Sequence, residues 1–239
     1  MDRTYNRRRG FALIVVLSTL SIIALLFAIA SNRAINRLSD TRTDFLVAQD
    51  AQDRTSLLAL AAQVYGDAET PLATDMMLPV QWRGENAELR LQDAGGLIDL
   101  NTANPAMLER LATALEVTPA QLEAYRVWRR APLRLQRTSD FVRVTGGDAA
   151  LRESLLPIAT VFSGRPGIAV ELAPIELLEH LTGSTGSRDI LIRELQTDWV
   201  SPPSGANYHV TVMNKGDQAI HLGVINVGST ANGLIISSF

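Results

Sequence analysis

The feature that most constrains this chain is a run of twenty uncharged residues, from Phe11 to Ala30. At about 1.5 Å per residue, a helix of this length crosses a bilayer core of about 30 Å. The ten residues before the run carry four arginines and one aspartate, and they end in RRRG. Because positive charge flanking a span stays on the cytoplasmic side, we expect a single-pass helix with a cytoplasmic N-terminus and all later residues outside.

Two alternatives for the same run are open from the residues alone. Ala28, Ile29 and Ala30 form a small-x-small pattern that a signal peptidase could cut. The apolar region of a secretory signal is shorter, however, at about 7 to 15 residues. An anchor that is never cut needs the same apolar length as a processed span. The length therefore indicates a membrane helix, and its processing has to be argued from other residues.

Composition narrows the classes of protein. With 239 residues, 46% hydrophobic and a net charge of -3, the chain has room for a membrane helix and one or two modest folded units. The absence of cysteine excludes disulfides, a thiolate zinc site and a cysteine nucleophile. None of the three histidines, His180, His209 and His221, lies in a nucleophile-elbow, metal-ligand or paired-carboxylate pattern. We therefore expect a protein that is not an enzyme.

The helical pattern continues after the apolar run. No proline interrupts the chain before Pro71, and apolar side chains recur at roughly helical spacing among arginines and aspartates. We expect one helix of more than fifty residues, in which 11–30 span the membrane and 31–68 pack as an amphipathic helix on the chain's own folded domain. The apolar positions of this second part are Ile35, Leu38, Phe45, Ala48, Leu57, Leu58, Ala61 and Val64.

The stretch RRRGFALIVVLSTL resembles the start of type IV pilin-like proteins, in which a short basic leader ends in glycine before an aromatic or methionine residue and an apolar helix. The resemblance implies that residues 1–10 are a cytoplasmic leader, that prepilin peptidase cuts after Gly10, and that the new amino group of Phe11 is methylated. Most such proteins have glutamate at the fifth mature position, where this chain has Val15. The K-type minor pseudopilin of the type II secretion system (general secretion pathway protein K family) typically lacks that acid, and the chain resembles this member.

Val15 also bears on where in a filament the chain belongs. A carboxylate inside the bilayer is costly unless it is paired, so a glutamate is useful when it meets the terminal amine of a neighbouring subunit. Val15 has no such cost and offers no such partner. By resemblance this suits a subunit at the tip of the filament. From composition alone, Val15 is simply a good membrane residue.

Alternating apolar residues predict strands on both sides of a helical middle. We expect residues 76–95 and 200–239 to form one small antiparallel sheet on which the N-terminal helix packs, which gives an α+β fold. The predicted strands are residues 80–82, 87–91, 208–213, 220–227 and 234–237, the first two joined at residues 83–85.

Residues 96–199 are predicted to form an all-helical (helix-hairpin-helix or SAM-like) insertion. Asn104 or Thr102 and, further on, Thr118 precede prolines at early helical positions, and Asp148 stands before a third helix. The stretch IDLNTANPAMLERL, from residue 98, aligns without gaps with IAVELAPIELLEHL, from residue 168, with five identities in fourteen positions. K-type pseudopilins resemble this pattern, with a strand-to-helix motif at both edges of such an insertion. The second copy lacks the Asn-Thr pair of the first.

The same segment resembles helix-hairpin-helix DNA binders, through IDLNTANPAMLERL and RTSDFVRVTGGDAALRESL. Phosphate binding in that module needs a glycine-flanked hairpin, and the hairpin at residues 116–118 has no glycine and begins with an acid. Residues 94–163 hold eight arginines and seven acidic residues, so we expect no nucleic-acid partner and instead a solvated or partner-facing basic patch. The basic patch consists of Arg126, Arg129, Arg130, Arg134 and Arg137.

No cofactor is expected. Some pseudopilins bind calcium, so the resemblance is compatible with a calcium site. No stretch of this chain alternates oxygen ligands as a calcium loop does, and the sequence therefore does not identify such a site. The aspartates in predicted loops are Asp67, Asp93, Asp99, Asp140, Asp148 and Asp217.

Taken together, the resemblance implies a structural minor pseudopilin at the tip of the type II secretion pseudopilus. Such a subunit initiates or caps the filament that drives export of folded proteins. Its implied partners are other minor pseudopilins, the inner-membrane platform, prepilin peptidase and the inner membrane, with the C-terminal domain in the periplasm. The alternatives are a membrane-tethered DNA receptor and a plain anchored periplasmic domain.

Overall fold

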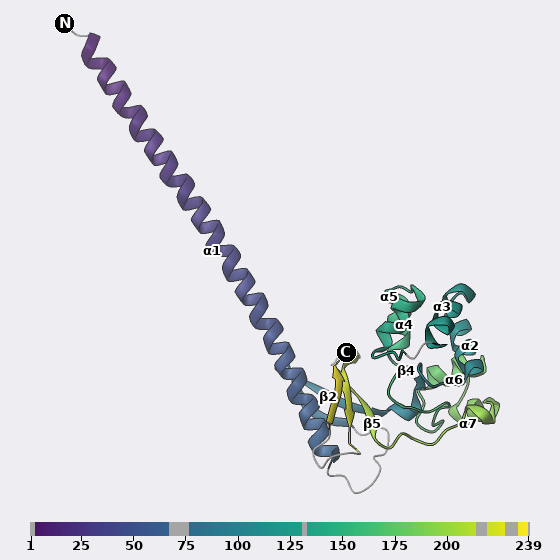
Figure 1. The fold of residues 1–239 in the computed structure, drawn as a ribbon. Helices are drawn as coiled ribbons and strands as arrows, with labels where there is room; N and C mark the ends of the chain where they lie inside the picture. The colour runs from purple at the N-terminus through teal and green to yellow at the C-terminus, as the bar shows by residue number, and fades with distance from the viewer. Residues whose placement is uncertain (1–2, 67–76, 131–132, 214–218, 228–233, 239) are drawn as a thin grey trace. The chain divides into compact units, whose positions relative to one another are not determined.

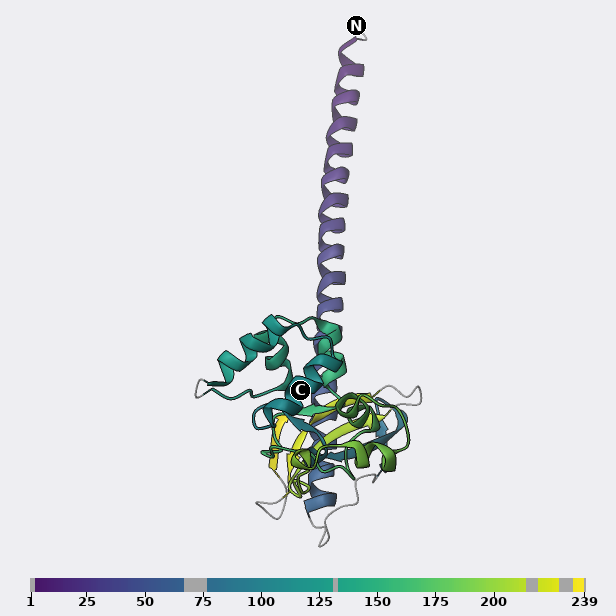
Figure 2. The same ribbon diagram turned by 90° about the vertical axis from the view of Figure 1, so that its right-hand side faces the viewer.

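A computed structural model describes residues 3–66, 77–130, 133–213, 219–227 and 234–238. The chain divides into two compact units, residues 1–52 and 53–239. One unbroken helix, α1 (Arg3–Gly66), forms the described part of the first unit and continues into the second (Figures 1 and 2). The expected helix of more than fifty residues is therefore confirmed.

Within the described residues, α1 is long and apolar enough to cross a membrane. Its most apolar window has a mean hydropathy of 2.2, and none of that window is buried. Leu20, Ile23 and Phe27, for example, are 58%, 62% and 74% exposed. The apolar run thus forms a helix whose side chains find no cover in their own unit.

The second unit contains a five-stranded antiparallel sheet in the order β1-β2-β5-β6-β7. The turn between the first two strands consists of Arg83 and Gly84, both with positive φ (52° and 80°), as a two-residue hairpin turn requires. The predicted strand pair and the predicted meander are both present, which confirms the α+β class. The strands are β1 (Met77–Trp82), β2 (Glu85–Asp93), β5 (Asn207–Met213), β6 (Ala219–Asn226) and β7 (Leu234–Ser238).

The last turns of α1 cover one face of this sheet. Leu57, Leu58, Ala61 and Ala62 are buried in one cluster with side chains that alternate along the strands. The strand residues of the cluster include Trp82, Ala87, Leu89, Leu91, Tyr208, Val210, Val212, Leu222 and Ile225.

The expectation that residues 31–68 pack on the chain's own folded domain is met in the second unit at Leu57, Leu58 and Ala61, and other apolar positions of this stretch are exposed. Ile35, Leu38 and Phe45 are 61%, 71% and 65% exposed, and Ala48 and Val64 are exposed as well. The physical reason is length. The nine residues of β2 extend over about 30 Å, which matches only about twenty residues of helix, whereas α1 has 64 residues.

An insertion with its own core lies between β2 and β5. It is helical apart from two short parallel pairings, β3 (Ile98–Asp99) with β4 (Ala159–Thr160) and Ile168 with Val200. Its core contains Tyr125, Phe141 and leucines from several of its helices. The helices are α2 (Pro105–Ala114), α3 (Pro119–Arg130), α4 (Thr138–Thr145), α5 (Ala149–Leu155), α6 (Ile175–Thr182) and α7 (Arg188–Glu194), with 3-10 turns η1 (Ala94–Gly96) and η2 (Thr197–Trp199).

Three helix starts are capped as the sequence predicts. Asn104 Oδ1 accepts from Ala106 N at 2.9 Å, and Asp148 Oδ1 accepts from Leu151 N at 3.0 Å. Thr118 and Gln121 form a reciprocal pair, in which Thr118 Oγ1 accepts from Gln121 N and Gln121 Oε1 accepts from Thr118 N. Of the two helix-capping residues considered for α2, Asn104 is the one used.

The alignment of residues 98–111 with 168–181 corresponds to a structural repeat. Ile98 N donates to Ile158 O at 3.0 Å, and Ile168 N donates to Trp199 O at 2.8 Å, so each copy begins with a parallel pairing. A turn and then a helix follow in both, with the helix starting seventy residues later in the second copy. The equivalent buried pairs are Leu100 and Val170, Ala103 and Ala173, Met107 and Leu177, Leu108 and Leu178, and Leu111 and Leu181.

Candidate functional site

The predicted processing site lies near the start of α1. The backbone of Gly10 and Phe11 is helical, and the side chains of residues 1–14 lie outside what the structure describes. Cleavage after Gly10 and methylation of Phe11 are not tested by this geometry and stay predictions. They depend on the basic leader and on the apolar helix that follows it.

Val15 begins the described part of the apolar surface. It is 45% exposed, and its neighbours Val16 and Leu17 are 53% and 56% exposed. Thr19, about one turn later, donates its hydroxyl to the carbonyls of Val15 and Val16 at 3.1 and 2.9 Å. Because this hydroxyl is satisfied inside the helix, Thr19 can lie in an apolar phase without an unpaired polar group.

Two arginines of the basic patch are used within the insertion. Arg126 pairs with Glu109 on α2 and, at 3.4 Å, with Glu123 one turn earlier on α3. Arg129 donates to the carbonyl of Ala103 at 2.9 Å. Arg126 thus joins α3 to α2, and Arg129 joins α3 to the turn before α2, which gives both side chains a structural role.

The other three arginines of the basic patch, Arg130, Arg134 and Arg137, have exposed side chains. Arg137 contributes its backbone N–H to the carboxylate of Asp140 at 3.0 Å, which starts α4. The structure therefore divides the predicted patch into two anchored and three solvated residues, and it shows no phosphate-binding hairpin at residues 116–118, where Glu116 has a φ of 56°.

Arg129 also lies near the buried hydroxyl of Tyr125 and affects its pKa. The Tyr125 hydroxyl donates to the carbonyl of Leu100, and its ring meets Phe141 edge-on with ring centroids 4.7 Å apart. Burial raises the pKa of Tyr125 to about 12, an effect that nearby Arg129 opposes and Asp99 strengthens. Tyr125 is thus a neutral, structural hydrogen-bond donor at any physiological pH.

Two aspartates among the calcium candidates have backbone partners instead. Asp93 accepts from the N–H groups of Gly95, Ser204 and Gly205 at 2.6, 3.0 and 3.0 Å. Asp99, 1% exposed, does the same for residues 101, 102 and 164 at 2.8, 3.2 and 2.7 Å. Both carboxylates therefore join loops, a role that the sequence did not reveal.

Metal-ligand geometry does not appear elsewhere in the described part of the chain. No group of three or more histidine, aspartate or glutamate side chains there is arranged to hold a metal ion. Asp140 and Asp148 each start a helix. Asp67 and Asp217 lie outside the described residues.

A buried histidine connects the sheet to the insertion. His209 on β5 is 3% exposed, and its Nε2 lies 2.7 Å from the hydroxyl of Thr160 on β4. Burial, together with the charge of His221 on the neighbouring strand, lowers the pKa of His209 to about 3. Burial also lowers the pKa of His221, whose Nδ1 lies 3.2 Å from the Thr211 hydroxyl. Both rings are therefore neutral structural groups near pH 7.

Comparison with known proteins adds one finding. No family model and no curated protein matches the chain. Among solved structures, it is similar to the GspK-GspI-GspJ complex from the type 2 secretion system of enterotoxigenic Escherichia coli. This likeness has 15% sequence identity and a TM-score of 0.47, and it covers 82% of this chain and 96% of that chain. The assignment of a role therefore rests on the residues of this chain.

Proposed function

We propose that this chain is a structural, non-enzymatic subunit of a pilin-like filament, namely a K-type minor pseudopilin of a type II secretion system. The observation that carries the proposal is the division of α1 into a fully exposed apolar half and a terminal part packed on an antiparallel sheet. The first half suits a membrane before assembly and neighbouring helices after it. The basic leader that ends at Gly10 supports the same assignment.

The proposed place in the filament is the tip, where the subunit initiates or caps the pseudopilus that drives export of folded proteins. Val15 supports this place because it lacks the carboxylate that would pair with the amine of a subunit above it. The proposed partners are other minor pseudopilins and the inner-membrane platform, with prepilin peptidase as the processing enzyme. The proposed location is the inner membrane, N-terminus in the cytoplasm and sheet and insertion in the periplasm.

The contacts of the basic patch support this proposal over a DNA receptor. Arg126 and Arg129 are held by intramolecular partners, which leaves three solvated arginines. Specific DNA binding relies on many phosphate contacts, and a nearly balanced set of charges gives little counterion release.

The mature N-terminus tests the proposal. Mass spectrometry of the full-length protein, expressed with prepilin peptidase and extracted from membranes, should find a chain that begins with N-methylated Phe11. Gly10→Leu should leave the leader attached, whereas Arg9→Lys should be processed normally. A mature chain that begins at Ser31, or one that keeps Met1 in the native background, would overturn the pseudopilin assignment.

A further inference from the structure

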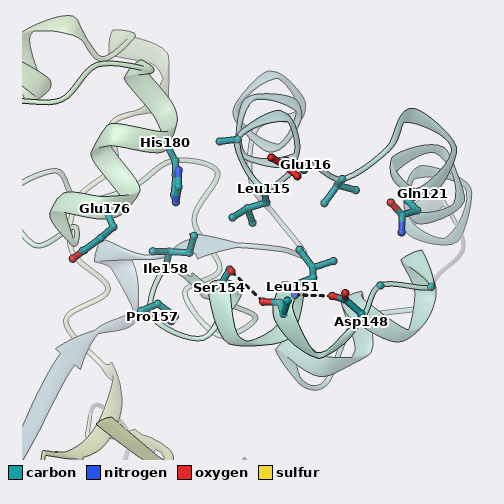
Figure 3. Close-up of a pocket in the computed structure, with 15 residues that line it drawn as sticks. Leu115, Glu116, Gln121, Asp148, Leu151, Ser154, Pro157, Ile158, Glu176 and His180 are labelled. Carbon is teal, nitrogen blue, oxygen red and sulfur yellow. Dashed lines mark hydrogen bonds between the residues drawn. The ribbon is translucent and has the colours of Figure 1, made fainter. Parts of the chain in front are cut away.

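The insertion contains a groove that the proposed function does not use. Its volume is about 730 Å³, within the range of about 300 to 1,000 Å³ that is usual for binding pockets. Figure 3 shows side chains from three directions facing this space: Leu115 and Glu116 at the end of α2, Leu151 and Ser154 on α5, and His180 on α6. The groove thus lies where three helices of the insertion meet.

Much of the lining is apolar and rests on the core of the insertion. Leu115 and Leu151 pack against that core, and Ile158, which is 1% exposed, belongs to it. The other apolar lining residues are Ala114, Val117, Ala150 and Pro157. Because Leu115, Leu151 and Ile158 belong to the packed core or rest on it, this part of the apolar surface is preformed and costs little to organise on binding.

The charges around the groove all have one sign. Glu116, Asp148 and Glu176 line it with exposed side chains, and no arginine or lysine is among its lining residues. Arg110, on the neighbouring helix face, is directed to the carbonyls of Leu181 and Thr182 at 3.1 and 3.0 Å. The Asp148 carboxylate is fixed by its contact with Leu151 N at 3.0 Å.

We propose that this groove docks a cationic, apolar segment of a partner protein. Apolar side chains of the segment enter between Leu115 and Leu151, and its lysine or arginine side chains face the three carboxylates. Charge complementarity of this kind selects a partner and speeds encounter, while the apolar contacts supply much of the affinity. The same three charges repel a polyanion. The proposal is independent of the assignment to a secretion filament and can fail or succeed separately.

The experiment uses the absence of cysteine in this chain. Ala150→Cys places an environment-sensitive dye at an exposed lining position, and Ala124→Cys places the same dye on an exposed turn of α3 outside the groove. The full chain, held in phosphatidylcholine nanodiscs, is titrated with a short amphipathic peptide of leucine and lysine. A peptide with glutamate in place of lysine is the matched control. We expect saturable fluorescence change only for the lysine peptide and only with the dye at residue 150.

Charge reversal then separates docking from general attraction. Changing Glu116→Lys together with Glu176→Lys should weaken binding by about tenfold or more, because like charges then face the peptide. The matched double variant, Glu171→Lys with Glu194→Lys, reverses two exposed carboxylates outside the groove and should leave affinity unchanged. Equal responses to both peptides, equal responses at both dye positions, or equal effects of both double variants would overturn the proposal. A dye response that depends on protein concentration without peptide would assign the groove to a second copy and also overturn it.

Discussion

Two stretches of the same helix have similar apolar content and opposite surroundings. Near the end of α1, Leu57, Leu58 and Ala61 are 7%, 3% and 0% exposed because the chain's own sheet covers them. Between Val15 and Ala30, the large apolar side chains are 42% to 74% exposed. Helical structure alone therefore does not decide coverage. The apolar side chains near the end of α1 are covered within the chain. Those between Val15 and Ala30 require an apolar phase or other helices from outside.

The largest expected effect is a difference in unfolding free energy between changes in the buried end of α1 and changes in its exposed apolar part. Leu58→Ala should lower the unfolding free energy of residues 53–239 by about 2 to 5 kcal/mol, because it leaves a cavity in the helix-sheet cluster. Leu20→Ala, the matched change at an exposed position, should alter it by less than about 0.5 kcal/mol. Denaturant titration followed by tryptophan fluorescence measures both, since Trp82 lies in the affected cluster. Equal effects would mean that the two stretches do not differ as described.

The second prediction places a charged side chain in the exposed apolar part of α1, between Val15 and Ala30. Val15→Glu should reduce membrane retention of the unassembled subunit, because an acidic residue at membrane depth costs about 2 to 4 kcal/mol. Val15→Leu should be silent. Cell fractionation measures retention, and exoprotein release from a strain lacking the native gene measures function. Better secretion with Val15→Glu, together with subunits along the filament shaft, would contradict the proposed tip position.

In the second unit, residues 53–239, the unfolding free energy should depend on pH through the buried ring of His209. Unfolded His209 takes up a proton below a pKa of about 6.5, whereas burial keeps the native ring neutral down to about pH 3. The unfolded state therefore binds more protons in this window, and the unfolding free energy falls as pH falls. Between pH 7 and 5.5 the contribution of His209 is about 1 kcal/mol.

His209→Gln keeps a polar side chain on β5 and removes this titration. Its unfolding free energy should depend less on pH over the same range, although His221 still contributes. Urea titrations of the full chain at four pH values compare the two slopes. Identical slopes for the native chain and His209→Gln would show that the ring is not buried in the neutral form.

The smallest effect concerns backbone strain at an exposed hairpin. Glu116 has a φ of 56°, a conformation that costs residues with a Cβ atom about 1 to 2 kcal/mol. Glu116→Gly should raise the unfolding free energy by about 0.5 kcal/mol, after the greater freedom of glycine in the unfolded chain is subtracted. Ala124→Gly, in the regular part of α3, should lower it by about 1 kcal/mol. A loss of stability with both changes would argue against strain at Glu116.

The sequence predicted the elements whose signals are local. Capping side chains before prolines marked the starts of α2 and α3, and alternation marked the strands on both sides of the insertion. The repeat at residues 98 and 168 was visible because the apolar frame is preserved while the polar residues differ. In the first copy, the Asn101 side chain accepts from Leu135 N at 2.8 Å and donates to Leu135 O at 3.0 Å. In the second copy, the backbone is bound instead by Gln92, which donates to Leu172 O at 2.7 Å.

Long-range features could not be read in the same way. The groove, the Asp93 and Asp99 carboxylates and the His209–Thr160 contact join segments that lie far apart in the chain, and no spacing rule connects them. The extent of cover on α1 also escaped prediction, because it depends on the length of the sheet and not on the helical period. Gly10, Phe11 and Val15 belong to a different case, since their proposed roles involve molecules other than this chain.

The two ends of the insertion lie close together, where β2 and β5 pair, and this decides how the chain can be altered. Asp93 and Tyr208 are direct neighbours across β2 and β5, and the Asp93 carboxylate clasps Ser204 and Gly205 on the returning chain. More than a hundred residues therefore leave and rejoin the sheet at almost one point, where a short hairpin would serve equally well. Because the two flanking strands pair directly, the insertion can change in length or content while the sheet keeps its strand order and the face that packs against α1, provided that contacts such as His209–Thr160 are kept.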